Sequence, residues 1–128
     1  MSRSSDREEI FKILFQLIIK DSFASPDLIS VAKENSRNSS QFVKGHVKNI
    51  LDKKSNIDEV MGENLEDWDL DRIGTVERAI LSIAIYEIMW CSEIDNKVSI
   101  NEAIELAKKY GDEKAAPFVN GVLATIVN

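Results

Sequence analysis

Few side chains in this 128-residue sequence could carry catalysis. It has one histidine, His46, and one cysteine, Cys91. His46 stands in a lysine-rich segment with no nucleophile or metal ligand at a suitable spacing, which favours a solvated or half-buried imidazole. Cys91 follows an apolar run and is expected to be a packed thiol rather than a nucleophile. A single Cys and a single His also exclude an internal disulfide and a Cys/His zinc site.

Other ligand-binding patterns are missing as well. The sequence has no glycine-rich phosphate loop, because Gly111 and Gly121 stand ten residues apart on different expected elements. The carboxylates between residues 58 and 71 lack the alternating spacing and central glycine of a calcium loop. We therefore expect no enzymatic activity, no cofactor and no metal.

Charge is unevenly distributed along the chain. The net charge is −6, which argues against non-specific nucleic-acid binding. Residues 32–54, however, hold six Lys and Arg against two acidic residues, whereas residues 58–71 hold seven acidic residues and no basic one. Such a division indicates two kinds of partner, although two solvated helix faces would give the same pattern.

Helical periodicity dominates, and no segment shows the alternation typical of strands. The segment 76–89 is apolar almost all round, which predicts a central, buried helix. The other apolar stripes fall in residues 10–18, 28–32, 42–61, 100–110 and 118–126, with a turn pinned by Leu65, Trp68, Leu70 and Ile73. The expected start signals are Asp6, Ser25 before Pro26, Thr75, a capping box from Ser99 to Glu102, and Pro117. This predicts one all-α domain of about seven helices joined by short loops.

The hydropathy pattern also bears on location. The longest apolar runs have four or five residues, so no segment should span a membrane. The N-terminus lacks the pattern of a secretory signal. We expect a soluble, reduced, cytoplasmic protein.

Three long segments carry a more specific pattern. They are WDLDRIGTVERAIL at 68–81 with AIYE at 84–87, KVSINEAIELAK at 97–108, and FVNGVL at 118–123. In order and spacing they resemble the signatures of the NusB transcription antitermination factors. The resemblance implies an all-α fold of two helical subdomains, residues 1–62 and 63–128. It also implies binding of boxA RNA in nascent, chiefly ribosomal RNA, transcripts together with the ribosomal protein NusE, in a complex that lets RNA polymerase pass terminators.

The resemblance assigns candidate roles to individual residues. The expected RNA-binding residues are Arg3, Arg7, Arg78, Lys114 and Phe118. The expected NusE-facing residues are Phe15, Asp71 and Glu77. This sequence has Phe15 where the family has a tyrosine, and Lys114 where an acidic residue is common.

Simpler interpretations stay open for some of these residues. Phe118 could belong to the core, and Glu77 would favour the start of its helix whatever its partner. Two alternative functions also remain, a helical protein–protein adaptor with little RNA binding and a stand-alone NusB-like module related to rRNA cytosine methyltransferases. The free protein could be a monomer or a homodimer.

Overall fold

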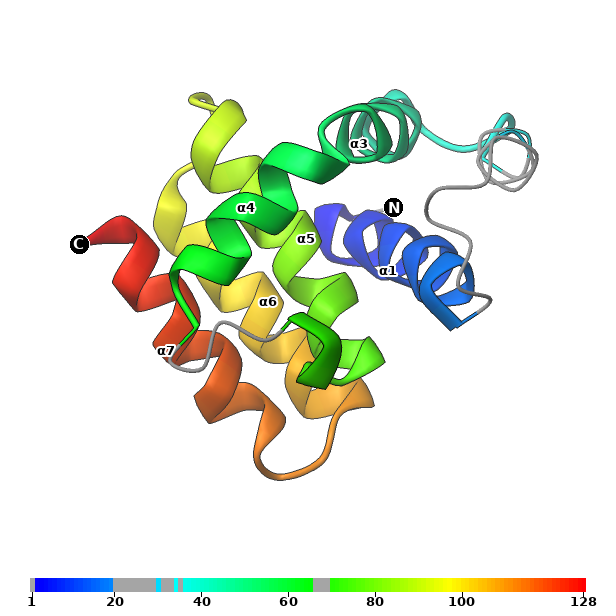
Figure 1. The fold of residues 1–128 in the computed structure, drawn as a ribbon. Coiled ribbons are helices and arrows are strands. Elements are labelled where there is room, and N and C mark those ends of the chain that lie inside the picture. Colours follow the sequence, from blue (N-terminus) through cyan, green and yellow to red (C-terminus); the bar gives the residue numbers. More distant parts are fainter. Residues whose placement is uncertain (1, 20–29, 31–33, 35, 66–69) are drawn as a thin grey trace.

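The computed structural model of the chain describes residues 2–19, 30, 34, 36–65 and 70–128. Within these ranges the protein is all-helical, with six α-helices, one 3₁₀ helix and no strand (Figure 1). The elements are α1 (Arg3–Ile19), α3 (Gln41–Asp52), α4 (Lys54–Glu63), η1 (Leu70–Arg72), α5 (Thr75–Trp90), α6 (Asn96–Tyr110) and α7 (Ala115–Val127). The expected all-α fold is confirmed. Of the expected helix over 28–32 the structure describes only Ser30, which is helical. The expected packing of Trp68 lies outside the described residues.

Helix α5 occupies the centre of the molecule, as the sequence predicts. Every residue from Ala79 to Glu87 is buried, and the helix packs against α1, α3, α4, α6 and α7 (Figure 1). A helix surrounded in this way is expected to be apolar almost all round, because little of its surface is left for water. One hydrophobic core cluster includes residues from all six α-helices.

The expected continuous helix over 42–61 is wrong, because the chain forms two helices there. The break falls at Lys53, whose φ of −103° and ψ of 14° lie outside the helical range. On either side of it, Leu51 and Ile57 both point into the core. The break lets α4 turn and pack against α5 while α3 packs against α1.

Several expected helix starts are also displaced. Helix α6 begins at Asn96, where the Asp95 side chain accepts a hydrogen bond from the Lys97 N–H at 2.9 Å, so Ser99 lies inside the helix and caps nothing. Helix α1 begins before Asp6, α5 is preceded by Gly74 rather than by a Thr75 cap, and α7 begins before Pro117.

No helix that the structure describes is both long and apolar enough to cross a membrane. The division into subdomains at residue 62 stays a prediction.

Candidate nucleic-acid interface

Three of the predicted interface residues line one hollow at the N-terminal ends of α5 and α7. Glu77, Lys114 and Phe118 surround a pocket of about 240 Å³. Its other lining residues are Arg72, Ile73, Gly74, Asp112 and Ala115. The pocket therefore combines an aromatic ring, two cationic side chains and two carboxylates within a small volume.

Phe118 stands at the boundary between the core and solvent. Its neighbours on α7, Ala115 and Val119, are buried, yet Phe118 remains 39% exposed. The helix buries residues 115, 119, 122 and 123, which form one face, and Phe118 lies at the edge of that face. Its ring is consequently available to a partner.

Glu77 is held close to the backbone at this pocket. A Cβ placed on Gly74 would come within 2.0 Å of Glu77 Oε2, and one on Gly111 would lie 3.6 Å from Oε1. The carboxylate thus rests between two glycines, at the N-terminal end of α5 where the helix dipole favours a negative charge. Lys114 lies beside it at the start of α7, exposed to solvent.

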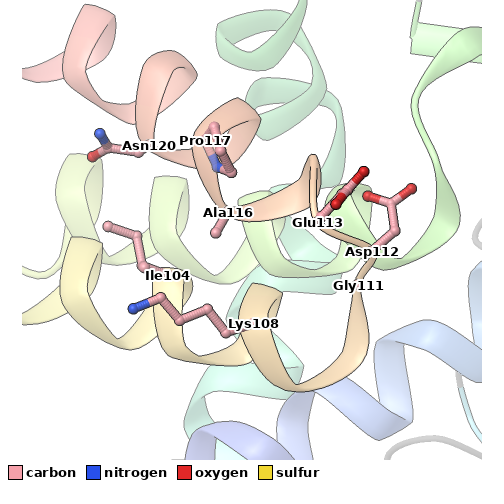
Figure 2. A pocket seen from close by; sticks show the side chains of 8 residues that line it. All are labelled: Ile104, Lys108, Gly111, Asp112, Glu113, Ala116, Pro117 and Asn120. Carbon is pink, nitrogen blue, oxygen red and sulfur yellow. The ribbon is translucent and has the colours of Figure 1, made fainter.

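A larger hollow adjoins this pocket between α6 and α7 (Figure 2). Its volume is about 530 Å³, and it shares Asp112 with the pocket around Glu77. The residues that line it are Ile104, Lys108, Gly111, Asp112, Glu113, Ala116, Pro117 and Asn120. Within the part of the chain that the structure describes, no group of three or more His, Cys, Asp or Glu side chains could hold a metal ion.

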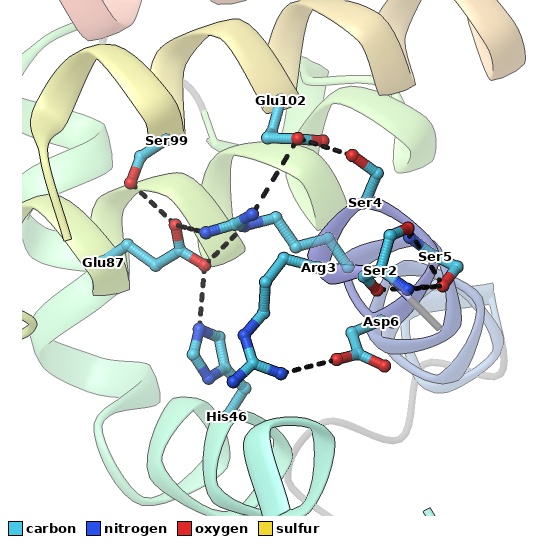
Figure 3. A network of polar contacts seen from close by, with 10 residues as sticks. Ser2, Arg3, Ser4, Ser5, Asp6, His46, Glu87, Ser99 and Glu102 are labelled. Carbon is cyan, nitrogen blue, oxygen red and sulfur yellow. Dashed lines mark hydrogen bonds and ion pairs between the residues drawn. The ribbon is translucent and has the colours of Figure 1, made fainter. Parts of the chain in front are cut away.

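The start of α1 forms a second group, and here one expectation needs correction. Arg3 is exposed over 64% of its side chain and pairs with Asp6 at 3.0 Å (Figure 3). Arg7 is a predicted RNA-binding residue, which requires a position at the surface, but it is only 3% exposed. Its Nε and Nη2 donate to the two carboxylate oxygens of Glu87 at 2.9 and 3.0 Å. Because the guanidinium is buried and engaged, this side chain offers no free surface to a phosphate.

Glu87 is the centre of a buried polar network (Figure 3). Besides the two bonds from Arg7, it lies 2.8 Å from His46 Nε2 and accepts a hydrogen bond from Ser99 Oγ at 2.7 Å. Burial alone would raise the pKa of Glu87, but the hydrogen bonds from His46, Arg7 and Ser99 outweigh it and hold the pKa below its ordinary value. The network joins α1, α3, α5 and α6, and His46 is therefore buried rather than solvated.

The other predicted residues lie apart from both groups. Arg78 points toward α4, where its Nη2 lies 3.3 Å from Asp58 Oδ2. Phe15 is half-buried and its ring centroid lies 5.7 Å from that of Phe11. Asp71 belongs to η1, and its side chain lies outside the described residues.

Comparison with known proteins decides the family. The sequence model of the NusB family matches residues 4–128. The chain belongs to the NusB family. It is 45% identical over 127 residues to transcription antitermination protein NusB of Oceanobacillus iheyensis, with 99% of each chain covered. It is 41% identical over 126 residues to the protein of that name from Bacillus subtilis, covering 98% of this chain and 95% of the relative.

Solved NusB structures share the fold. The structure of T. maritima NusB superposes with a TM-score of 0.85 at 33% identity, covering 98% of this chain and 90% of the other. The crystal structure of antitermination factors NusB and NusE in complex with dsRNA gives 0.74 at 26% identity, with coverage of 97% and 94%. The expected membership of the NusB antitermination factors is thereby confirmed.

Sequence reasoning missed the buried network of this NusB-family chain. Glu87 stands alone as a charge in the segment 79–88, which is otherwise apolar apart from Ser82 and Tyr86. That isolation was the available signal, because a carboxylate on the buried helix must find a cation and hydrogen-bond donors. Its partners, Arg7 and His46, come from distant parts of the chain.

Proposed function

We propose that this chain is a transcription antitermination factor that binds boxA-type single-stranded RNA together with the ribosomal protein NusE. The complex lets RNA polymerase read through terminators, chiefly in ribosomal RNA transcripts, and the chain acts by binding rather than by catalysis. The observation that carries the proposal is the exposed Phe118 ring beside Lys114 and Glu77 in one pocket. The likeness to a NusB–NusE–dsRNA complex supports it.

The pocket has the parts that single-stranded RNA requires. An unstacked base can lie on the Phe118 ring, and the ammonium group of Lys114 can meet the neighbouring phosphate. Arg3 and Arg78 add cations outside the pocket, Arg3 at the start of α1 and Arg78 on the α4 side of α5. An RNA that contacts all of these residues would have to reach from the pocket to the start of α1.

The acidic side of the same region suits a basic protein. Glu77 is fixed at the N-terminal end of α5, and Asp71 precedes it on η1. We assign these two residues to NusE, with Phe15 as an apolar contact. Complementary charge would speed encounter and fix orientation. Because Glu77 and Phe118 line one pocket, the two partners would meet there.

RNA binding should depend strongly on NusE. Of the two N-terminal arginines, Arg7 is committed to Glu87 in the interior, which leaves only Arg3 to meet a phosphate. Each phosphate neutralised on single-stranded RNA contributes a slope of about −0.7 to the dependence of log affinity on log salt. Because few cations are available, we expect the protein without NusE to bind RNA weakly, with a shallow salt dependence.

The same observation favours a second candidate, a helical adaptor that binds NusE with little RNA contact. The two candidates differ in the role of Phe118. The deciding experiment measures binding of a boxA-type RNA in the presence of NusE by wild type, Phe118→Ala and Val127→Ala.

Val127 is a matched control, because it lies on α7 and is 38% exposed, against 39% for Phe118. Loss of a stacked base predicts an RNA affinity about 5- to 150-fold lower for Phe118→Ala only, equivalent to about 1–3 kcal/mol. Normal RNA affinity of Phe118→Ala, with the fold intact, would favour the adaptor.

A further inference from the structure

Four side chains from three helices form a column beside the start of α1. The Arg3 Cζ atom lies 4.3 Å from the centroid of the Phe42 ring. On α3, that ring is stacked on His46 with centroids 3.9 Å apart and an interplanar angle of 27°. The His46 ring in turn meets Tyr86 of α5 edge-on, at 5.0 Å and 82°. The exposed Arg3 guanidinium thus lies over the Phe42 ring, and that ring packs on His46.

The base of this column is fixed. His46 Nε2 lies 2.8 Å from Glu87 Oε2, and Glu87 is 1% exposed and also bonded to Arg7 and Ser99. The first turn of α3, which carries Phe42, is capped by Ser40, whose hydroxyl accepts from the Val43 N–H at 3.2 Å. The His46 ring on which Phe42 stacks is therefore itself held in place.

The two arginines near Phe42 are not equivalent. Arg7 Cζ lies 5.2 Å from the ring centroid, but its Nε and Nη2 are used by Glu87 in the interior. Arg3 keeps 64% of its side chain exposed and gives only Nη1 to Asp6, at 3.0 Å. A guanidinium stacked on a ring presents its remaining N–H groups sideways in a fixed plane, which suits a phosphate.

We propose that Phe42 is a positioning residue, which His46 supports, and that it presents the Arg3 guanidinium to an RNA phosphate. The inference rests on the RNA binding proposed above and deepens it. A long, exposed arginine loses conformational freedom when it binds, and a side chain already held in place loses less. Phe42 acts through Arg3 and does not touch the RNA.

The test is a double-mutant cycle on RNA affinity, measured with a boxA-type RNA and NusE. The variants are Phe42→Leu, which keeps an apolar side chain and removes the ring, Arg3→Ala, and the two combined. Phe42→Leu should lower affinity about 2- to 5-fold, the range expected of an exposed cation–π contact. In the Phe42→Leu background, Arg3→Ala should cost less than in wild type, and Phe42→Tyr should restore affinity. A purely structural role for Phe42 would not couple to Arg3 in this way.

The outcomes separate this inference from the proposed function. If wild type binds RNA and the effects of Phe42→Leu and Arg3→Ala simply add, the inference is overturned and the RNA function stands. If wild type binds no RNA even with NusE, both are overturned.

Should Phe42→Leu fail to fold, Arg3→Lys carries the test. It keeps the charge at an exposed position but lacks the flat guanidinium. A 2- to 5-fold lower affinity supports positioning by the ring, while wild-type affinity overturns it.

Discussion

Replacing Glu87 by Gln should destabilise the protein severely, although the two side chains have nearly the same shape. The Glu87 carboxylate accepts two bonds from Arg7 and one from Ser99, and it pairs with His46, all at 2.7–3.0 Å. A glutamine can accept at only one end, so its amide nitrogen must face donors. The Arg7 guanidinium, which is 3% exposed, also loses its nearest counter-charge and keeps only the Glu102 carboxylate, 4.0 Å from its Nη1.

The expected magnitude follows from that burial. Removing one member of a buried ion pair costs about 3–5 kcal/mol, because the other charge is left unpaired. Domains of this size have a free energy of unfolding of about 5–15 kcal/mol, so about a fifth or more of the stability would be lost. Urea unfolding followed by circular dichroism measures the change, provided that the slope with denaturant stays constant.

A surface pair supplies the control. Glu105→Gln removes a carboxylate of which 71% is exposed and which lies 3.7 Å from Lys108 Nζ, and should cost under about 1 kcal/mol. The combined variant Arg7→Met with Glu87→Gln should be less destabilised than the two single changes added together, since no buried charge remains. A loss below about 1 kcal/mol for Glu87→Gln would refute the importance of the network.

The same network predicts a pH dependence. The pKa of Glu87 in the folded protein lies below its ordinary value, so unfolding raises its affinity for a proton. Its contribution to stability is therefore present above the unfolded pKa of about 4.5 and is lost as the pH falls through the folded pKa. Glu87→Gln should remove this part of the acid dependence, and an unchanged acid-unfolding profile would contradict the assignment.

Three further changes test the core and the pocket. Ile80→Ala, at a fully buried site on α5, should lower the free energy of unfolding by about 2–5 kcal/mol in urea unfolding, and a loss under about 0.5 kcal/mol would contradict the central position of that helix. Gly74→Ala should change the free energy of unfolding by under about 1 kcal/mol. It should nevertheless weaken NusE binding in calorimetry, because the new Cβ displaces the Glu77 carboxylate. Unchanged affinity for NusE would show that the position of this carboxylate is unimportant. Glu77→Lys should weaken NusE binding and alter its salt dependence, and wild-type affinity at low salt would remove Glu77 from the interface.

The sequence predicts a helix well where the composition of that helix alone indicates how deeply it is buried. The segment 76–89 is apolar almost all round, so its burial as α5 could be foreseen. The break at Lys53 could not, because residues 42–61 keep a helical spacing through it. Only the packing of α3 on α1 and of α4 on α5 requires a change of direction there. The sequence places the start of α6 at Ser99 rather than at Asn96, because Asp95 and Ser99 are both suitable N-cap residues. In the structure Asp95 caps the helix, and the Ser99 hydroxyl donates to Glu87 instead.

The candidate site also contains one residue that the sequence identifies and one pairing that it does not. The resemblance of 118–123 to a family signature singled out Phe118, and its exposure at the edge of α7 suits a contact with a partner. The same resemblance gave Arg7 a role in RNA binding, but its side chain is turned inward, because its guanidinium pairs with the buried Glu87. Which arginine faces solvent depends on a carboxylate 80 residues away. Local sequence carries no information on that pairing.

The most direct test of the account is the affinity of the isolated protein for a boxA-type RNA, compared with that of the protein with NusE, at two salt concentrations. A scrambled RNA of equal length serves as the control. We expect the isolated protein to bind boxA-type RNA weakly with a shallow salt dependence, and the protein with NusE to bind it much more tightly and selectively. Equal affinity for boxA and scrambled RNA in the presence of NusE would contradict the proposed function, and tight, steeply salt-dependent binding without NusE would contradict the dependence on the partner.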